Sequence, residues 1–435
     1  MHVISKVSVE GFWETYNFDF AMNNDVTFFI GQNGTGKTTL INLIAAALEV
    51  DLRTLVKIPF KKITISFDRA DKNKQAFISV TKKEKKERPF EQFEYVMLNP
   101  AVASKEVKLT LGDEPDWVHY EPRWLNEHAR FNDFSNRGRQ RIARFIERMV
   151  NVNWLSVNRI SLTAASRDDK TYELLVDKKL EGLSNDLVRY FASLSKRKDE
   201  EVRLFQESLF MTLLEQHEDF NPFEFRHVYR TDLEQYGEVL KNIFAELHVE
   251  NERVQPVIGA FINRAKSIIQ RLAERDRDDK GILLNEAIFV SEFRKIENIV
   301  DRWNNIQDKL NEIFSPKDRF LSICNALFQR KSMTLDAENE FQFTSRSGKP
   351  LTTAMLSSGE KQLLILLSEV LLQREQPFVF IADEPELSLH VLWQEKLIGS
   401  LRHLNPNAQI IVATHSPDIV GALADNAIDM ESLIR

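Results

Sequence analysis

Glycine is concentrated at one place in this chain. Only 14 of the 435 residues are glycine, yet Gly31, Gly34 and Gly36 fall within six positions. The apolar run Val26–Ile30 before them has the length and composition of a buried strand, and the run Leu40–Leu48 after them predicts a helix packed on several sides. A strand, a glycine loop and a helix in this order are typical of the start of an α/β fold.

The glycine loop carries a specific pattern. Residues 31–38 match G-x-x-x-x-G-K-[ST] in full. The backbone N–H groups of such a loop hold phosphate oxygens, an approach that a Cβ would block, and the following helix adds its positive N-terminal end. We expect Lys37 to reach the β- and γ-phosphates of a nucleotide and the Thr38 hydroxyl to coordinate Mg²⁺. The alternative is a tight glycine turn without a ligand, which the flanking strand and helix disfavour. The predicted nucleotide-binding residues here are Gly31, Gln32, Asn33, Gly34, Thr35, Gly36, Lys37, Thr38 and Thr39.

Two carboxylates follow a second apolar run. Asp383 and Glu384 come directly after Phe378–Ala382, which predicts an inner strand. The carboxyl ends of strands in open α/β sheets are where phosphates bind. We therefore expect Asp383 to hold Mg²⁺ and Glu384 to orient and deprotonate an attacking water. The alternative is a solvated acidic turn before Pro385.

A third segment places small residues at a predicted helix start. Ser357, Ser358 and Gly359 precede the apolar run Leu363–Leu372, and the N-terminus of a helix attracts anions. The alternative is a purely structural N-cap, in which Ser357 and Glu360 form a capping box.

A histidine ends a further predicted strand. His415 follows the apolar run Gln409–Ala413. At that place it can hydrogen-bond a γ-phosphate or the attacking water. The alternative is an ordinary loop histidine.

Charge and cysteine content narrow the class of protein. The chain has 58 Lys and Arg against 65 Asp and Glu, a net charge of −7, which excludes a uniformly basic nucleic-acid coat. The single cysteine, Cys324, excludes a disulfide framework and a Cys-rich zinc site. No apolar run is long enough to cross a bilayer, and the first residues do not read as a signal peptide. We expect a cytoplasmic protein with no membrane contact.

The order of these motifs resembles that of the ABC-type ATPases. More narrowly, it is similar to the branch that contains the SMC and RecF repair ATPases, the OLD family and phage-defence ATPases. Leu356–Gln362 resembles the ABC signature, Ser388–His390 lies where the class has its D-loop, and His415 lies where it has the switch histidine. Ser358 stands where transporters usually have glycine, which favours the SMC/OLD branch. Residues 1–50 and 340–420 carry the resemblance.

The resemblance implies an α/β fold, a P-loop ABC-type ATPase head with a β-rich N-terminal lobe and a helical insertion domain. Residues 1–165 would form the N-terminal part of the head, and residues 331–435 its C-terminal part. Residues 166–330 would form the insertion, for interaction or assembly. Within it the pattern is helical, as in Leu187–Leu194 and Glu201–Leu214, without heptads long enough for an extended coiled coil.

The resemblance also implies a composite site in a homo-oligomer. Ser357, Ser358 and Gly359 of one subunit would close over ATP held by the loop of another, so that ATP binding joins subunits and hydrolysis releases them. Asn158 and Arg159 lie roughly where a Q-loop would sense the γ-phosphate, although no glutamine is present there.

The functional prediction rests on what the chain does not contain. The insertion is too short for SMC arms, and there is no Cys-x-x-Cys hook. With 20 residues after His415, we expect no Toprim nuclease in this chain. We expect an ATPase that senses a phage trigger and controls a separate toxic effector, a Toprim-type or other nuclease, most similar to the sensor ATPase of PARIS-type systems. The alternatives are a RecF/SMC-like DNA-binding ATPase in repair or recombination and the nucleotide-binding subunit of a transporter.

One predicted helix, over 137–149, has a basic face. Its arginines are spaced at i, i+4, i+7 and i+11, while apolar residues take the other face. Such a face could bind DNA phosphates or an acidic partner protein. The alternative is a solvated face with intramolecular carboxylate partners. The four arginines are Arg137, Arg141, Arg144 and Arg148.

Overall fold

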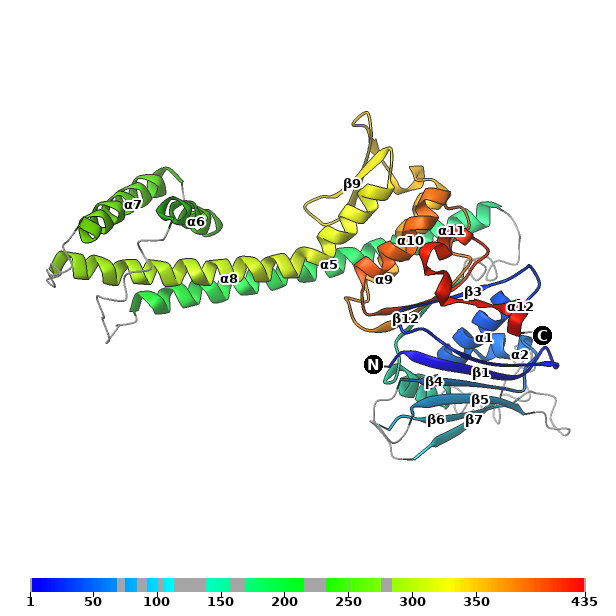
Figure 1. Ribbon diagram of the computed structural model, residues 1–435. Coiled ribbons are helices and arrows are strands. Elements are labelled where there is room, and N and C mark those ends of the chain that lie inside the picture. The colour runs from blue at the N-terminus through cyan, green and yellow to red at the C-terminus, as the bar shows by residue number, and fades with distance from the viewer. Residues whose placement is uncertain are drawn as a thin grey trace, which may run out of the picture. The chain divides into compact units, whose positions relative to one another are not determined.

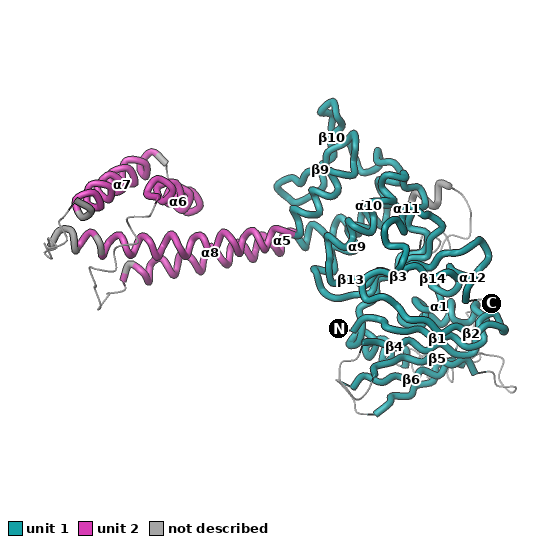
Figure 2. The backbone as a smooth tube through the Cα atoms, in the orientation of Figure 1, with its two compact units in different colours: residues 1–190, 316–435 teal, residues 191–315 magenta. Residues whose placement is uncertain are grey.

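The computed structural model describes residues 2–68, 75–83, 92–100, 105–112, 138–156, 169–214, 232–249, 251–274 and 284–433. The chain divides into two units: residues 1–190 with 316–435, and residues 191–315 (Figure 2). The first unit joins the two ends of the chain, and the second is contained within one stretch of sequence.

The first unit contains a five-stranded parallel sheet. Its strands are β3 (Val26–Ile30), β8 (Val152–Ser156), β12 (Phe378–Asp383), β13 (Ala408–Ala413) and β14 (Ala427–Asp429). Their order is β14-β3-β13-β12-β8, and every neighbouring pair is parallel. All residues of β12 and β13 are buried, as expected for central strands covered on both faces. Because β3, β13 and β12 are neighbours, the segments that follow them meet at one edge of the sheet.

A second, antiparallel sheet forms the N-terminal lobe of this unit. Its order is β2-β1-β4-β5-β6-β7, and buried and half-buried residues alternate along β4. This is the pattern of a sheet with one face on the core and one face in solvent. The strands are β1 (Ile4–Phe12), β2 (Tyr16–Ala21), β4 (Lys62–Phe67), β5 (Phe77–Lys83), β6 (Gln92–Leu98) and β7 (Val107–Gly112).

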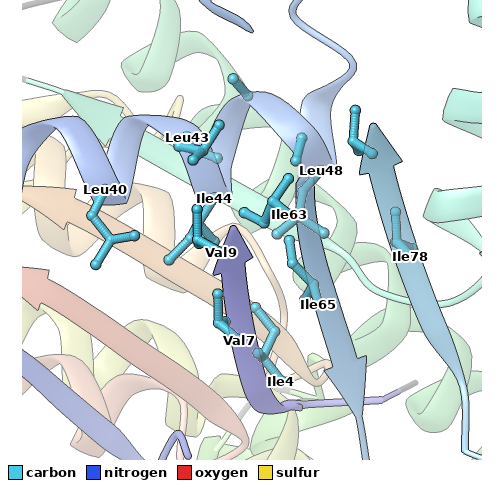
Figure 3. Close-up of a cluster of buried hydrophobic side chains, with 14 of the residues drawn as sticks. Ile4, Val7, Val9, Leu40, Leu43, Ile44, Leu48, Ile63, Ile65 and Ile78 are labelled. Atoms are coloured by element: carbon cyan, nitrogen blue, oxygen red, sulfur yellow. The ribbon is translucent and has the colours of Figure 1, made fainter. Parts of the chain in front are cut away.

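Helix α1 (Lys37–Glu49) lies between the two sheets. Leu40, Leu43, Ile44 and Leu48 of this helix point into a buried cluster with side chains of the antiparallel sheet (Figure 3). The same cluster contains apolar side chains of β12 and β13. The predicted strand–loop–helix start is therefore confirmed, and α1 holds the glycine loop between two packed layers.

Helices α9 (Ser358–Leu371) and α10 (Val391–Leu404) lie across the parallel sheet from α1 (Figure 1). Asn153 of β8 donates to Glu369 of α9 at 2.7 Å, which ties the helix to the sheet. A small antiparallel sheet precedes α9, with the order β11-β10-β9. The remaining elements of the unit are α2 (Leu52–Lys57), β9 (Lys331–Leu335), β10 (Phe341–Ser345), β11 (Pro350–Leu351), η3 (Thr353–Met355), α11 (Pro417–Val420), η4 (Gly421–Asn426) and α12 (Met430–Leu433).

The second unit is helical. It contains α6 (Leu233–Glu246), α7 (Asn251–Glu274) and parts of α5 (Asp169–Leu214) and α8 (Leu284–Leu327). Within it α5 and α8 run antiparallel, since Glu201 pairs with Lys309 at 3.0 Å and the ring centroids of Phe205 and Trp303 lie 5.2 Å apart. No described helix is long and apolar enough to span a membrane.

The sequence pattern predicted helix over 187–194 and 201–214, but it did not predict that these stretches are continuous. The structure joins 187–194 and 201–214 in the single helix α5, which has 46 residues. An apolar repeat does not mark the whole length of α5, because ion pairs at i,i+3 and i,i+4 also stabilise it. Arg203, for example, pairs with Glu200 and Glu207. Pairing with α8 then fixes the helix through tertiary contacts that no local pattern reveals.

Candidate nucleotide site

The glycine loop has the backbone geometry of an open cradle. Gly31, Gly34 and Gly36 all have positive φ, at 141°, 87° and 90°. A Cβ at Gly36 would lie 3.0 Å from the Trp13 ring and 3.1 Å from Phe12, so a side chain there would meet two rings of the β1–β2 turn. Gly36 is also the N-cap of α1 and offers no side chain to the first N–H groups of the helix. These N–H groups are thus left for an anion.

Lys37 lies folded back on this loop. Its Nζ donates to Gly31 O at 2.8 Å and to Gln32 O at 3.1 Å, and it lies 3.4 Å from Nδ1 of His415. Only 4% of the residue is exposed, and burial lowers the pKa of its ammonium. A buried cation beside a cradle of N–H groups is suited to an anionic ligand.

The two predicted magnesium ligands contact each other. Thr38 Oγ1 donates to Asp383 Oδ1 at 3.0 Å, although 345 positions separate them. Asp383 ends β12 and is 1% exposed. A hydroxyl and a carboxylate oxygen next to a phosphate cradle are the donors that Mg²⁺ takes in such sites, so these residues fit the ion.

Glu384 and His415 complete the group. His415 Nε2 lies 3.3 Å from Glu384 Oε1, so the imidazole stands between this carboxylate and Lys37. Glu384 has a positive φ of 48°, and its N–H donates to Ala413 O at 2.8 Å, which anchors the turn after β12 to β13. Burial and the neighbouring Glu386 carboxylate raise the pKa of Glu384 to about 7. Burial and the nearby Lys37 charge lower the pKa of His415.

Sequence reasoning missed Glu386. Its Oε1 accepts hydrogen bonds from the Thr414 hydroxyl, from His415 N at 3.0 Å and from Ser416 N at 3.2 Å. One buried carboxylate thus fixes the backbone that carries His415. The sequence does show a third carboxylate two positions after Glu384. It does not show that this carboxylate binds a loop almost thirty residues away, because only the folded chain brings the two together.

The segment Ser357–Gly359 makes its described contacts with Glu360 and with the loop at Ser388, and not with the glycine loop. Ser357 is the N-cap of α9 and forms the predicted capping box with Glu360. A Cβ at Gly359 would collide with the carbonyl oxygen of Ser388, so glycine lets α9 approach this loop. Ser357 and Ser358 are exposed, and no hydrogen bond of the described residues joins this segment to residues 31–39. The capping box, which was the alternative interpretation of Ser357, is therefore present. The Ser357 side chain is nevertheless exposed to solvent.

The remaining predicted residues divide into two groups. Thr39 is a half-buried residue of the first turn of α1, and Gln32 and Asn33 are exposed at the tip of the loop. Asn158, Arg159 and Arg137 lie outside the described residues. Trp13, which sequence reasoning did not select, places a ring directly beside the loop.

Comparison with known proteins assigns the family. A family model described as "AAA domain, putative AbiEii toxin, Type IV TA system" matches residues 26–421, a range that contains every residue of the candidate site. The chain belongs to this AAA-domain family. This match confirms the predicted resemblance at the level of a nucleotide-binding ATPase family.

Three relatives of this AAA-domain protein are similar over short stretches. The Septu protein PtuA of Bacillus thuringiensis is 35% identical over 86 residues, 17% of this chain and 22% of that protein. The Retron Vc95 probable ATPase of Vibrio cholerae serotype O1 biovar El Tor is 30% identical over 94 residues, 19% of this chain and 18% of that protein. The Retron Ec83 probable ATPase of Escherichia coli is 23% identical over 175 residues, 34% of this chain and 31% of that protein. The chain therefore matches under a third of the length of each relative.

Solved structures give a weak overall similarity. The Smc head domain of Pyrococcus furiosus, with an extended coiled coil and bound to the C-terminal domain of ScpA, has a TM-score of 0.42 and 14% identity, covering 100% of this chain and 95% of that chain. The Smc head domain of Pyrococcus yayanosii has a TM-score of 0.38 and 16% identity, covering 97% and 93%. The strand order and the geometry of the glycine loop are themselves those of an α/β P-loop fold.

Proposed function

We propose that this AAA-domain protein binds ATP with Mg²⁺ and hydrolyses it to ADP and phosphate. One observation carries the proposal: Lys37, Thr38, Asp383, Glu384 and His415 converge on one edge of the parallel sheet, next to the glycine loop. Three segments far apart in sequence supply them, so a local turn or an ordinary loop histidine does not explain the arrangement.

The residues have distinct roles in this proposal. Glu384 accepts a proton from the water that attacks the γ-phosphorus, while the bond from that phosphorus to the bridging oxygen breaks and ADP leaves with the electron pair. Lys37 leaves the loop carbonyls to bind the phosphate oxygens, and the His415 imidazole hydrogen-bonds the transferring group. Thr38 and Asp383 would hold Mg²⁺, which neutralises phosphate charge when bound.

Glu386 is a positioning residue in this scheme, and its removal should separate binding from turnover. We expect Glu386→Ala to free the backbone of residues 414–416 and so to lower the hydrolysis rate by about 10- to 100-fold, because small misplacements of a reacting group are costly. Nucleotide affinity should change less than about threefold, since the loop that holds the phosphates is untouched. Steady-state kinetics and titration with a fluorescent ATP analogue measure both.

A conservative variant distinguishes positioning from general destabilisation. Glu386→Gln keeps an oxygen that accepts the His415 and Ser416 N–H groups, so it should recover a large part of the lost rate. Equal losses in the alanine and glutamine variants, or a loss of affinity that matches the loss of rate, would count against the assignment.

We further propose that a second copy of the chain completes the site. Ser357 and Ser358 are exposed at the start of α9, where the N-terminus faces solvent. Apolar side chains are exposed around them, a composition typical of a contact surface. They are Met355 at 60%, Leu387 at 45%, Val391 at 47% and Leu392 at 43% exposure. Two heads that meet head-to-tail would cover this surface and bring the serines of one to the loop of the other.

A long cation at Ser357 should prevent this assembly. We expect Ser357→Arg to leave ATP bound to single subunits and to abolish the ATP-dependent increase in mass, because the side chain would stand in the contact. Light scattering after size-exclusion chromatography, with and without ATP and Mg²⁺, gives the result. Ser347→Arg, which alters an exposed serine between β10 and β11, is the matched control. Assembly by Ser357→Arg at the normal ATP concentration would refute the proposed contact.

At the biological level we propose an ATPase of a phage-defence system that senses a phage-derived trigger and controls a separate toxic effector, such as a nuclease. The names of the relatives, a Septu protein and two retron ATPases, support this class. The test is protection of Escherichia coli from a panel of phages by this chain expressed with its neighbouring gene. Protection should be lost with Glu384→Gln. Protection that persists with this variant, or that needs no neighbouring gene, would contradict the proposal.

A further inference from the structure

A cavity on the N-terminal lobe lies beside a helix whose basic face the sequence predicts. Residues 138–147 are helical, and Ile142 and Ile146 of this helix are buried, as the predicted apolar face requires. The cavity of about 250 Å³ opens between the helix and the outer strands β6 and β7. We call it the arginine pocket; its lining residues are Met97, Val107, Leu109, Phe145, Arg141, Arg144 and Arg148.

The floor of the arginine pocket is apolar. Met97 is fully buried, and Val107, Leu109 and Phe145 are half-buried at the margin of the core of the lobe. Their outer surfaces are not covered by the core and remain available in the cavity. An apolar group that entered would gain free energy because its surface would leave water.

The rim of the pocket carries three like charges. Arg141, Arg144 and Arg148 are exposed, and none of them makes an ion pair or hydrogen bond in the structure as described. Glu147, the adjacent carboxylate on the helix, lines a different cavity together with Glu49. The intramolecular carboxylate partners that would make this face an ordinary solvated one are therefore not found among the described residues.

The size and chemistry of the pocket narrow its ligand. Its volume lies below the roughly 300–1,000 Å³ of clefts for drug-sized molecules, so it fits about one large side chain. Arginine pairs with carboxylates through two parallel hydrogen bonds, and three arginines around one apolar hole match carboxylates on both sides of an apolar residue. The phosphates of duplex DNA could pair with the arginines, but a phosphate backbone offers no apolar group that would enter the cavity between them.

We propose that the arginine pocket is a docking site for an acidic peptide segment of a partner protein, with one large apolar side chain in the cavity and flanking Asp or Glu residues on the three arginines. This site is independent of the proposed nucleotide chemistry. It provides a surface by which the AAA-domain protein holds another protein without occupying the glycine loop.

The test uses random heptapeptides displayed on phage and selected on the full-length protein. We expect the enriched sequences to contain one Leu, Ile, Met or Phe with at least two acidic residues close to it. A synthetic peptide of the enriched sequence is then titrated by fluorescence anisotropy. Its affinity should fall at least about tenfold in Arg144→Glu/Arg148→Glu, since two charge-assisted pairs become repulsions, and about three- to tenfold in Phe145→Ala, which removes part of the floor.

Matched controls separate the pocket from general charge. Arg346→Glu changes an exposed arginine on the β10–β11 turn and should leave peptide affinity unchanged. ATP hydrolysis should be unchanged in all these variants, which also shows that they are folded. Three results would overturn the proposal: no enriched sequence, enrichment that survives Arg144→Glu/Arg148→Glu, or a 20-base-pair duplex that binds more tightly than the peptide and loses affinity in the same variants.

Discussion

Replacing Glu384 by glutamine should leave ATP binding intact and lower steady-state hydrolysis by about 10²- to 10⁴-fold, the usual contribution of a general base. The amide keeps the size of the side chain and an oxygen near His415 Nε2, which lies 3.3 Å from Glu384 Oε1, but it cannot take a proton from water. The loss should therefore fall on turnover alone. Phosphate release gives the rate, and titration with a fluorescent ATP analogue gives the affinity.

The same variant should hold the protein in its assembled form. If ATP joins two heads and hydrolysis releases them, a head that binds but does not cleave accumulates as the ATP-bound dimer. Light scattering should show a doubled mass for Glu384→Gln in ATP and Mg²⁺, and the single-subunit mass in ADP. Glu395→Gln, an exposed glutamate of α10, is the control and should behave as the unaltered protein. Normal hydrolysis by Glu384→Gln would show that another group is the base.

The second large effect is expected from Lys37→Ala. Lys37 supplies the buried cation of the loop and is the side chain that we expect on the phosphates. Two or more charge-assisted hydrogen bonds at about 1.5–3 kcal/mol each would be lost, so ATP affinity should fall at least 100-fold. The rise in melting temperature that saturating ATP gives to the unaltered protein should disappear, because stabilisation by a ligand requires that it binds.

Melting without nucleotide serves as the internal control for this variant. The buried ammonium of Lys37 is desolvated, and burial lowers its pKa, so its removal relieves a cost that offsets the lost hydrogen bonds to the loop carbonyls. We expect the unliganded melting temperature to change by only a few degrees. Lys57→Ala, at the exposed end of α2, should change neither property. An ATP-dependent shift of normal size in Lys37→Ala would exclude the glycine loop as the binding site.

Residues within short, regular motifs were predictable. The pattern at 31–38, the Asp-Glu pair at the end of β12 and the histidine after β13 each follow an apolar run, and parallel strands bring such endings to one edge. The structure places them as this rule requires. The position of Ser357 in a capping box was also readable, because a cap depends only on residues three positions apart.

Other features depend on contacts that sequence order does not reveal. The continuity of the 46 residues in α5 was not predicted because exposed ion pairs and a partner helix stabilise it, and neither leaves an apolar repeat. Arg141 and Arg144 on the helix 138–147, and Arg148 directly after it, could be seen as basic but not as unpaired, since ion pairing depends on which carboxylates the fold brings near.

The sequence alone determined that this chain contains a strand–loop–helix unit of the kind that binds phosphate. It also determined which carboxylates and which histidine end the neighbouring strands. Both were predictable because local backbone geometry and strand burial depend on residues adjacent in the sequence. Only the tertiary structure decided that Glu386 holds the backbone of His415, that Ser388 requires glycine at 359, and that an apolar cavity lies among the arginines. Each of these joins residues that folding alone brings within a few ångströms, and the energy of such contacts depends on distances that no single segment fixes.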